Sequence, residues 1–394
     1  MPRPSPFHPR TAPLCESHAW KTWAGFLAVC HYGPCGEAEY HAFRHAAGVL
    51  DVSPLCKYTV TGPDAARFLS YVWARDISRL KPGRVTYAAL CNDDGFLIDD
   101  GTIARIDDDH WRCTTASPSL HWFDRHARGF DVNIADTSEE TAALAVQGPR
   151  SKDLLNDATD GAVDGLRFFR ITQTSIDGVP VEISRTGYTG DLGYEVWLPA
   201  SKALRVWDAI AGAGRHHALQ PAGLDALDMT RVEAGFILQD VDYYSAMRAQ
   251  VRSRMSTPWE IGLGWTVEVD RPPFIGQDAL IASSKSPTWQ FVGLDIDWEE
   301  LEQLYERVGL PPHLPAAAWR TPIPVYSGTE QVGQATSGTW SPLLKKNLAL
   351  ASVKTPHSAT GTRLRIEQTV EFRRHKVTAT VVKRPFFDPE RKRT

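Results

Sequence analysis

The chain has 394 residues, of which 42% are hydrophobic and 23% are charged, and its formal net charge is -4 at pH 7. This length predicts two or three domains with sizeable hydrophobic cores. The small negative charge argues against nucleic acid or an anionic membrane as a partner, and no apolar run reaches the roughly twenty residues of a membrane span.

Six cysteines lie in the first third of the chain, and no C-x-x-C pair occurs: Cys15, Cys30, Cys35, Cys56, Cys91 and Cys113. Two of them bracket His31 in a spacing that matches no common zinc site. Scattered thiols in a chain of this size favour a reducing cytoplasm over a disulfide framework. We therefore expect a cytoplasmic protein that holds no metal.

The first predicted elements follow a lead-in over residues 1–36, which begins with alternating prolines and is expected to be flexible. Residues 39–47 predict a helix and residues 57–61 a strand. A Gly-Pro-Asp turn then caps a helix over residues 65–72. Two apolar runs separated by an Asp-Gly turn predict a hairpin over residues 86–98.

The middle of the chain continues with short strands and amphipathic helices. Strands are predicted over residues 142–146 and 179–184, and helices over residues 150–155, 201–213 and 224–235. Because few long crossovers separate the strands, this order favours an α+β fold over a doubly wound sheet.

The composition changes after Trp259. Residues 298–308 predict a charged helix, which is followed by a proline-rich loop. Short strands with glycine between them begin at residue 323. This spacing predicts a small all-β barrel domain over residues 286–394.

Two adjacent acidic residues, Asp99 and Asp100, follow the apolar run at residues 96–98. Neighbouring side chains on a strand point to opposite faces, so the two carboxylates cannot share a role. A buried carboxylate needs partners, so we expect at least one to meet a ligand, a cation or a cluster of backbone N–H groups. The alternative is that both lie in water at the end of the strand.

A glycine-rich run occupies residues 184–196 and contains Tyr188 and Glu195. Glycine leaves room for a flat ligand to approach the main chain closely. Tyr188 offers a ring for stacking, and Glu195 offers a carboxylate for a pair of N–H donors. The plain alternative is a glycine-rich hairpin that leads into a strand.

This run resembles the R-T-G-Y-T-G-E-D-G-Y-E signature of the aminomethyltransferase family, which includes the T-protein of the glycine cleavage system and folate-dependent demethylases. Residues 91–100 resemble the family's N-E-x-G-G-x-x-D-D segment. Further strings match in order, at residues 48–53 (G-x-x-D-V-S-H-M), 146–149 (L-Q-G-P), 227–235 (R-D-x-L-R-L-E-A-G), 262–265 (G-L-x-W), 274–280 (F-I-G-K-E-A-L) and 336–342 (T-S-G-T-F-S-P). The resemblance covers roughly residues 36–385.

The family fold is a cloverleaf of three domains around a central funnel that holds tetrahydrofolate. The resemblance therefore implies two interleaved α+β domains over residues 37–285, which bind folate, and a β-barrel-like domain over residues 286–394. It also implies tetrahydrofolate as the cofactor.

The resemblance assigns roles to four residues. Asp99 would lie beside the reactive folate nitrogens and move a proton as N5 forms its bond to carbon. Glu195 would hold the pterin amino and N3–H groups, Tyr188 would pack beside the ring, and Arg231 would bind near the folate through its fork of donors. In the ordinary alternatives, Arg231 pairs with Asp228 one helical turn back, Tyr188 is a core residue and Glu195 ends a strand.

The chain departs from the family pattern at positions expected on the substrate side. Phe96 replaces the second glycine of N-E-x-G-G, and Thr115 replaces the asparagine of a V-V-N-A-S-like string. Gln239 and Asp240 lie in an L-Q-D-V-D string where T-proteins have L-Y-G-N-D. Together with Tyr87, these residues are candidates for the side of the site beside the leaving group.

A retained folate site beside an altered substrate side implies a different one-carbon donor. We expect a tetrahydrofolate-dependent demethylase that moves a methyl group from a small O-, N- or S-methyl compound to N5. One alternative is an aminomethyltransferase of glycine cleavage, which takes its aminomethyl group from a lipoyl carrier protein. Another is a non-catalytic folate-binding protein. The insertion at residues 298–321 is also foreign to the T-protein.

Overall fold

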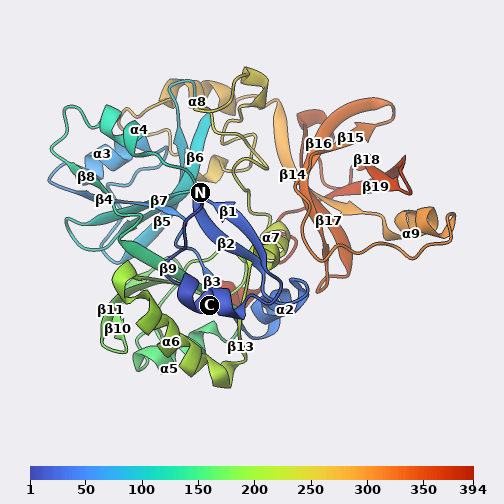
Figure 1. The fold of residues 1–394 in the computed structure, drawn as a ribbon. Coiled ribbons are helices and arrows are strands. Elements are labelled where there is room, and N and C mark those ends of the chain that lie inside the picture. Colours follow the sequence, from blue (N-terminus) through green and yellow to red (C-terminus); the bar gives the residue numbers. More distant parts are fainter.

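The computed structural model describes residues 1–394 as two sheets flanked by helices, a closed barrel and an N-terminal hairpin (Figure 1). The fold is α+β with a C-terminal barrel, as the sequence predicts. None of its helices has the length and apolar character needed to cross a membrane.

A five-stranded sheet carries the paired aspartates. Its strand order is β5-β6-β7-β4-β8, with β4 (Cys56–Thr61), β5 (Arg84–Cys91), β6 (Leu97–Arg105), β7 (Trp111–Thr115) and β8 (Asn133–Asp136). Helices α3 (Ala65–Val72) and α4 (Leu120–His126) bury apolar side chains against one face. The predicted hairpin forms between β5 and β6.

A six-stranded sheet carries the glycine-rich run. Its order is β10-β11-β12-β9-β3-β13, with β3 (Ala47–Asp51), β9 (Thr141–Gln147), β10 (Ile171–Ile176), β11 (Val179–Ser184), β12 (Gly193–Pro199) and β13 (Leu219–Pro221). The core on one face includes α5 (Ser151–Thr159) and α6 (Ala203–Gly214). The core on the other includes α2 (Glu37–His45) and α7 (Leu224–Glu233). Neighbours β3 and β9 are separated in sequence by the whole five-stranded sheet, so the two sheets interleave.

The C-terminal barrel closes in the order β14-β17-β16-β15-β18-β19. Its strands are β14 (Trp289–Ile296), β15 (Ile323–Ser327), β16 (Glu330–Ser341), β17 (Lys346–Lys354), β18 (Arg363–Val370) and β19 (Arg373–Val382). Helix α8 (Gln277–Ser284) precedes it, and α9 (Trp298–Glu306) packs on its core through Leu301. The Asp297 side chain caps α9 by accepting from the Glu300 N–H at 3.0 Å.

The expectation of a flexible lead-in over residues 1–36 is wrong. This segment forms α1 (His8–Thr11) and the hairpin of β1 (Ala19–Trp23) and β2 (Phe26–His31). Phe7 is fully buried, with its ring 6.0 Å from that of Trp207. The prolines around it suggest disorder, but one large apolar side chain ties the segment to the core.

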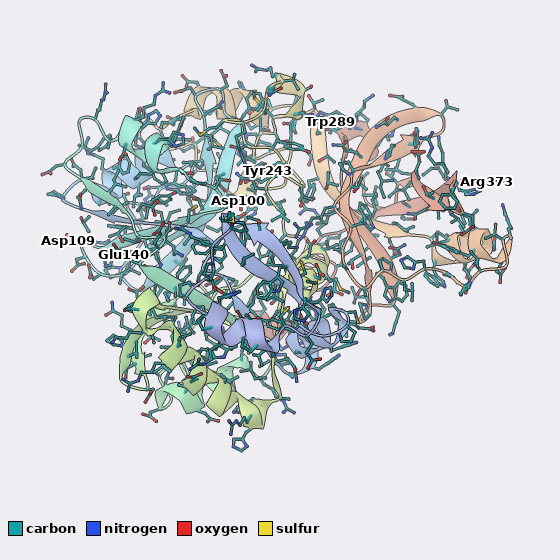
Figure 2. All side chains as sticks on the ribbon, viewed as in Figure 1. Asp100, Asp109, Glu140, Tyr243, Trp289 and Arg373 are labelled. Atoms are coloured by element: carbon teal, nitrogen blue, oxygen red, sulfur yellow. The ribbon has the colours of Figure 1, made fainter.

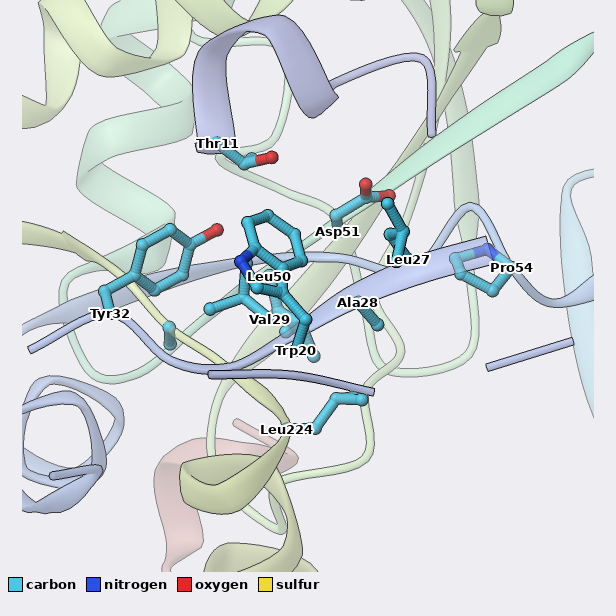
Figure 3. A pocket seen from close by; sticks show the side chains of 11 residues that line it. Thr11, Trp20, Leu27, Ala28, Val29, Tyr32, Leu50, Asp51, Pro54 and Leu224 are labelled. Atoms are coloured by element: carbon cyan, nitrogen blue, oxygen red, sulfur yellow. The ribbon is translucent and has the colours of Figure 1, made fainter. Parts of the chain in front are cut away.

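A small cavity lies beneath the N-terminal hairpin (Figure 3), lined by side chains that include Trp20, Tyr32 and Asp51. Its volume of about 10 Å³ admits no more than a water molecule. The cavity is therefore too small for a pterin.

Candidate functional site

Asp99 lies on β6 and is fully buried. One carboxylate oxygen accepts from the backbone N–H groups of Asp100 at 2.8 Å and Ala116 at 3.3 Å, and the other accepts from that of Ser117 at 2.9 Å. The structure thus confirms the prediction that one of the paired aspartates meets a cluster of backbone N–H groups. It excludes the solvated strand end for this residue.

The environment of Asp99 acts on its pKa in two directions. Burial and the nearby Asp100 carboxylate raise this pKa to about 8, against the three N–H groups that lower it. The balance of these effects moves the protonation equilibrium of Asp99 toward neutral pH, well above that of an ordinary carboxyl group. A pKa this close to the working pH is the property of a general acid or base.

Asp100 faces away from Asp99 and accepts hydrogen bonds from two tyrosines, Tyr87 and Tyr243. Asp100 and Tyr243 lie near the middle of the molecule (Figure 2). The Tyr87 ring stacks at 5.9 Å on that of Trp265, which is 62% exposed. Tyr243 is not among the residues predicted from the sequence, although it directly follows the string that departs from the T-protein pattern.

The glycines of the 184–196 run serve packing. A Cβ on Gly187 or Gly193 would lie 2.0 or 2.1 Å from Oε1 of Gln147. The Gln147 amide nitrogen donates to the carbonyls of Thr186 and Tyr194 at 3.2 and 3.1 Å. A buried side chain thus fills the space that these two glycines leave, and a flat ligand does not.

Tyr188 and Glu195 are both half-buried. The Tyr188 hydroxyl donates to the carbonyl of Ile237, and its ring lies 5.5 Å from that of Phe236. Glu195, on β12, accepts from Thr186 Oγ1 at 2.6 Å. Burial raises the pKa of Glu195, although the hydrogen bond from the Thr186 hydroxyl and the positive charge of Arg112 both lower it.

Arg231 lies on α7 and is 1% exposed. Its Nε donates to Asp228 and its Nη1 to Asp242, both at 2.7 Å. The ordinary alternative, a pair with Asp228, is therefore present. Its Nη2, however, is buried without a hydrogen-bond partner, and such a group in a native protein calls for an acceptor that is not part of the chain.

The candidates on the substrate side gather around the turn at residues 116–117, which holds Asp99. Thr115 Oγ1 donates to the Ser117 carbonyl at 2.7 Å, and the Ser117 hydroxyl donates to the Gln239 side chain. Gln239 in turn donates to the carbonyl of Ile98 at 2.9 Å. Thr115 and Gln239 are thus linked to Asp99 through Ser117.

Asp240 and Phe96 complete this side. Asp240 pairs with Arg248 at 2.8 Å, and Phe96 lies beneath Arg252, whose guanidinium is 4.8 Å from the ring centre. We did not predict either arginine, because both follow the matched strings and carry no motif of their own.

Comparison with protein-family models matches residues 11–271 to the GCVT N-terminal domain and residues 306–388 to the glycine cleavage T-protein C-terminal barrel domain. A crystal structure of the glycine cleavage aminomethyltransferase T from Bartonella henselae aligns with a TM-score of 0.83. It is 24% identical, and the alignment covers 98% of this chain and 99% of that one. This likeness supports the shared fold.

Curated relatives align along most of the chain. An aminomethyltransferase of Herpetosiphon aurantiacus is 35% identical, with 89% of each protein covered. A trimethylamine-oxide aldolase of Ruegeria pomeroyi is 36% identical over all of this chain, which spans 48% of that relative. The two domain matches and the aminomethyltransferase relatives agree with the motifs, and the chain belongs to the aminomethyltransferase (glycine cleavage T-protein) family.

Proposed function

We propose that the chain is a tetrahydrofolate-dependent demethylase, which moves a methyl group from a small methylated compound to N5 of the folate. One observation carries the proposal. Asp99 is a fully buried carboxyl group with a pKa raised to about 8, and it is hydrogen-bonded to a turn that also meets the residues departing from the T-protein pattern.

The residues present fit tetrahydrofolate. The unpartnered Nη2 of Arg231 is a buried donor that an acceptor on the folate would satisfy. Glu195 is a half-buried carboxylate suited to pterin N–H donors, and the half-buried Tyr188 offers a ring face. When bound, the folate supplies a nucleophilic nitrogen that takes up the carbon.

The chain's own residues would then manage a proton and exclude water. Asp99 would accept a proton at the folate nitrogen and would return it to the departing atom of the donor. The backbone N–H groups of Ala116 and Ser117 fix the direction of the carboxylate during both transfers. Burial of Asp99 keeps bulk water from competing for the proton.

One relative supports a nitrogen-bound methyl donor. The Ruegeria protein, similar over the whole of this chain, carries the name of an amine oxide. A second candidate, an aminomethyltransferase that takes its group from a lipoyl carrier, is supported by the relatives of that name.

Isotope labelling tests the proposal. The protein is incubated with tetrahydrofolate and, one at a time, with donors whose methyl groups carry ¹³C, and the pterin is analysed by mass spectrometry. We expect the label in methyl-tetrahydrofolate from at least one N-methyl donor, and we expect it to appear about 10²- to 10⁴-fold more slowly with Asp99→Asn. Label in the pterin at an equal rate with Asp99→Asn would contradict the role of Asp99.

A further inference from the structure

Asp240 stands in a backbone conformation that favours glycine. Its φ is +65°, and T-proteins have glycine at this position of the L-Y-G-N-D string. Aspartate adopts the left-handed region more readily than most residues, so the backbone accepts it in place of glycine. The replacement adds a carboxylate at this position.

The Asp240 carboxylate holds Arg248. Both Asp240 oxygens accept from Arg248 Nη2, at 2.9 and 2.8 Å, and the same nitrogen reaches Ser117 Oγ at 3.2 Å. The Ser117 N–H donates to Asp99. Ser117 therefore links the Arg248 guanidinium to the buried Asp99 carboxyl group. The Nε–H and Nη1 donors of Arg248 make no hydrogen bond to the protein, which leaves one side of its fork of donors open.

A second departure from the family places a second arginine. Phe96 replaces a glycine, and the Arg252 guanidinium lies over its ring at 4.8 Å with no carboxylate partner. The segment that carries both arginines is fixed to β6 at two points. The Ala246 N–H donates to the Leu97 carbonyl at 2.7 Å, and the Leu97 N–H donates to the Ser256 carbonyl at 2.9 Å.

We propose that Arg248 and Arg252 form a subsite for a carboxylate on the one-carbon donor, so that the donor is a small N-methyl compound that also carries a carboxylate. The inference rests on the proposed function and names its substrate class. Guanidinium groups bind carboxylates through paired N–H donors. Arg248 and Arg252 are both exposed, and only Arg248 has an acidic partner, Asp240. The pair of arginines therefore keeps a net positive charge that a carboxylate would neutralise.

The test compares N,N-dimethylglycine with its neutral amide, N,N-dimethylglycinamide, which offers the same methyl groups without the charge. We expect the protein to prefer the acid, and Arg248→Ala to reduce kcat/KM for the acid about 10- to 100-fold through KM, the loss typical of one charge-assisted contact. The amide should be affected less than about twofold. Arg248→Lys should recover part of the loss, and Arg373→Ala, an exposed arginine on the barrel (Figure 2), should leave both donors unchanged.

Two further measurements separate the possible failures. Calorimetry with the non-reactive folic acid present measures binding of N,N-dimethylglycine without turnover. Binding that depends on Arg248, but without methyl transfer, would support the subsite and contradict the demethylase. Equal kcat/KM for acid and amide would overturn the subsite and leave the demethylase standing. A third outcome is that Arg248→Ala weakens the binding of triglutamyl tetrahydrofolate but leaves the binding of monoglutamyl tetrahydrofolate and of the donor unchanged. That result would assign the arginines to the folate tail and overturn the inference.

Discussion

Asp99 is subject to two opposing influences. Three backbone N–H groups favour its ionised form, and burial beside Asp100 favours its neutral form. Burial prevails, and the pKa rises to about 8. A carboxyl group that gains or loses a proton near neutral pH can accept one from the folate amine and return it within one turnover.

The pH dependence of turnover follows from this pKa. A base must be ionised to act, and below pH 8 most of the Asp99 population is protonated. We expect kcat/KM to rise about tenfold per pH unit below 8 and to level off above it. Asp99→Asn should remove this dependence of kcat/KM on pH and reduce the rate about 10²- to 10⁴-fold. A profile that stays flat from pH 6 to 9 would show that another group moves the proton.

Glu195 should contribute to folate binding more than to the fold. Glu195→Gln keeps the shape of the side chain but removes the charge that pterin N–H donors would meet. We expect the Kd for tetrahydrofolate to rise about 10- to 100-fold, measured by isothermal titration. Glu140→Gln, which alters an exposed residue just before β9 (Figure 2), is the matched control and should leave this Kd unchanged. An unchanged Kd with Glu195→Gln would place the pterin elsewhere.

Single residues show where the sequence was informative. The paired aspartates predicted a buried carboxylate with N–H partners, because a carboxylate buried on an apolar strand is costly unless hydrogen bonds or an opposite charge stabilise it. The glycine-rich run was misread, because glycine signals open space without saying what fills it, and Gln147 lies some forty residues away in sequence. Arg248 and Arg252 lacked any local pattern.

At the scale of elements, local signals located most helices and strands. The helix predicted over residues 65–72 has those bounds in the structure, because a Gly-Pro-Asp turn marks its start. The N-terminal hairpin was missed, because its stability comes from contacts with distant parts of the chain. Arg3, for instance, bonds to the backbone of Gly25 and Leu27, and Phe7 packs on α6.

The N-terminal segment should therefore contribute to global stability. Phe7→Ala removes a fully buried ring from the core beneath the six-stranded sheet. We expect a loss of about 3 to 5 kcal/mol in the free energy of unfolding, measured by urea denaturation. Leu14→Ala, at a position that is 45% exposed, should change it by less than about 0.5 kcal/mol. Similar small effects for both variants would indicate that the segment is detached in solution.

At the scale of the whole molecule, a buried charged network joins the barrel to the site. Asp242 accepts from Arg231 at 2.7 Å, from the Leu238 N–H at 2.8 Å and from Ser337 on β16 at 3.1 Å. Arg320, in the segment between β14 and β15, donates to Asp228 at 2.6 Å. The guanidinium expected to meet folate is thus held between α7 and the barrel, which no local reading of the sequence could reveal.

Breaking this network should affect stability and folate binding together. Asp242→Ala leaves the Arg231 guanidinium with one carboxylate fewer in a buried position, and we expect a loss of about 3 to 5 kcal/mol in unfolding free energy. Thermal unfolding with and without folate measures both effects. Asp295→Ala, which removes a partly exposed pair with Lys346 on the barrel, should cost less than about 1 kcal/mol. If both variants lowered the free energy of unfolding by the same small amount, the Asp242 network would not stabilise the contact between α7 and the barrel.

The most direct test of the account is the identity of the folate product when methylated amines and an aminomethyl-loaded lipoyl carrier are offered to the same preparation. The account predicts methyl-tetrahydrofolate from a small N-methyl donor, at a rate that depends on Asp99. Methylene-tetrahydrofolate formed from the lipoyl carrier alone would contradict it and make the chain an aminomethyltransferase of glycine cleavage.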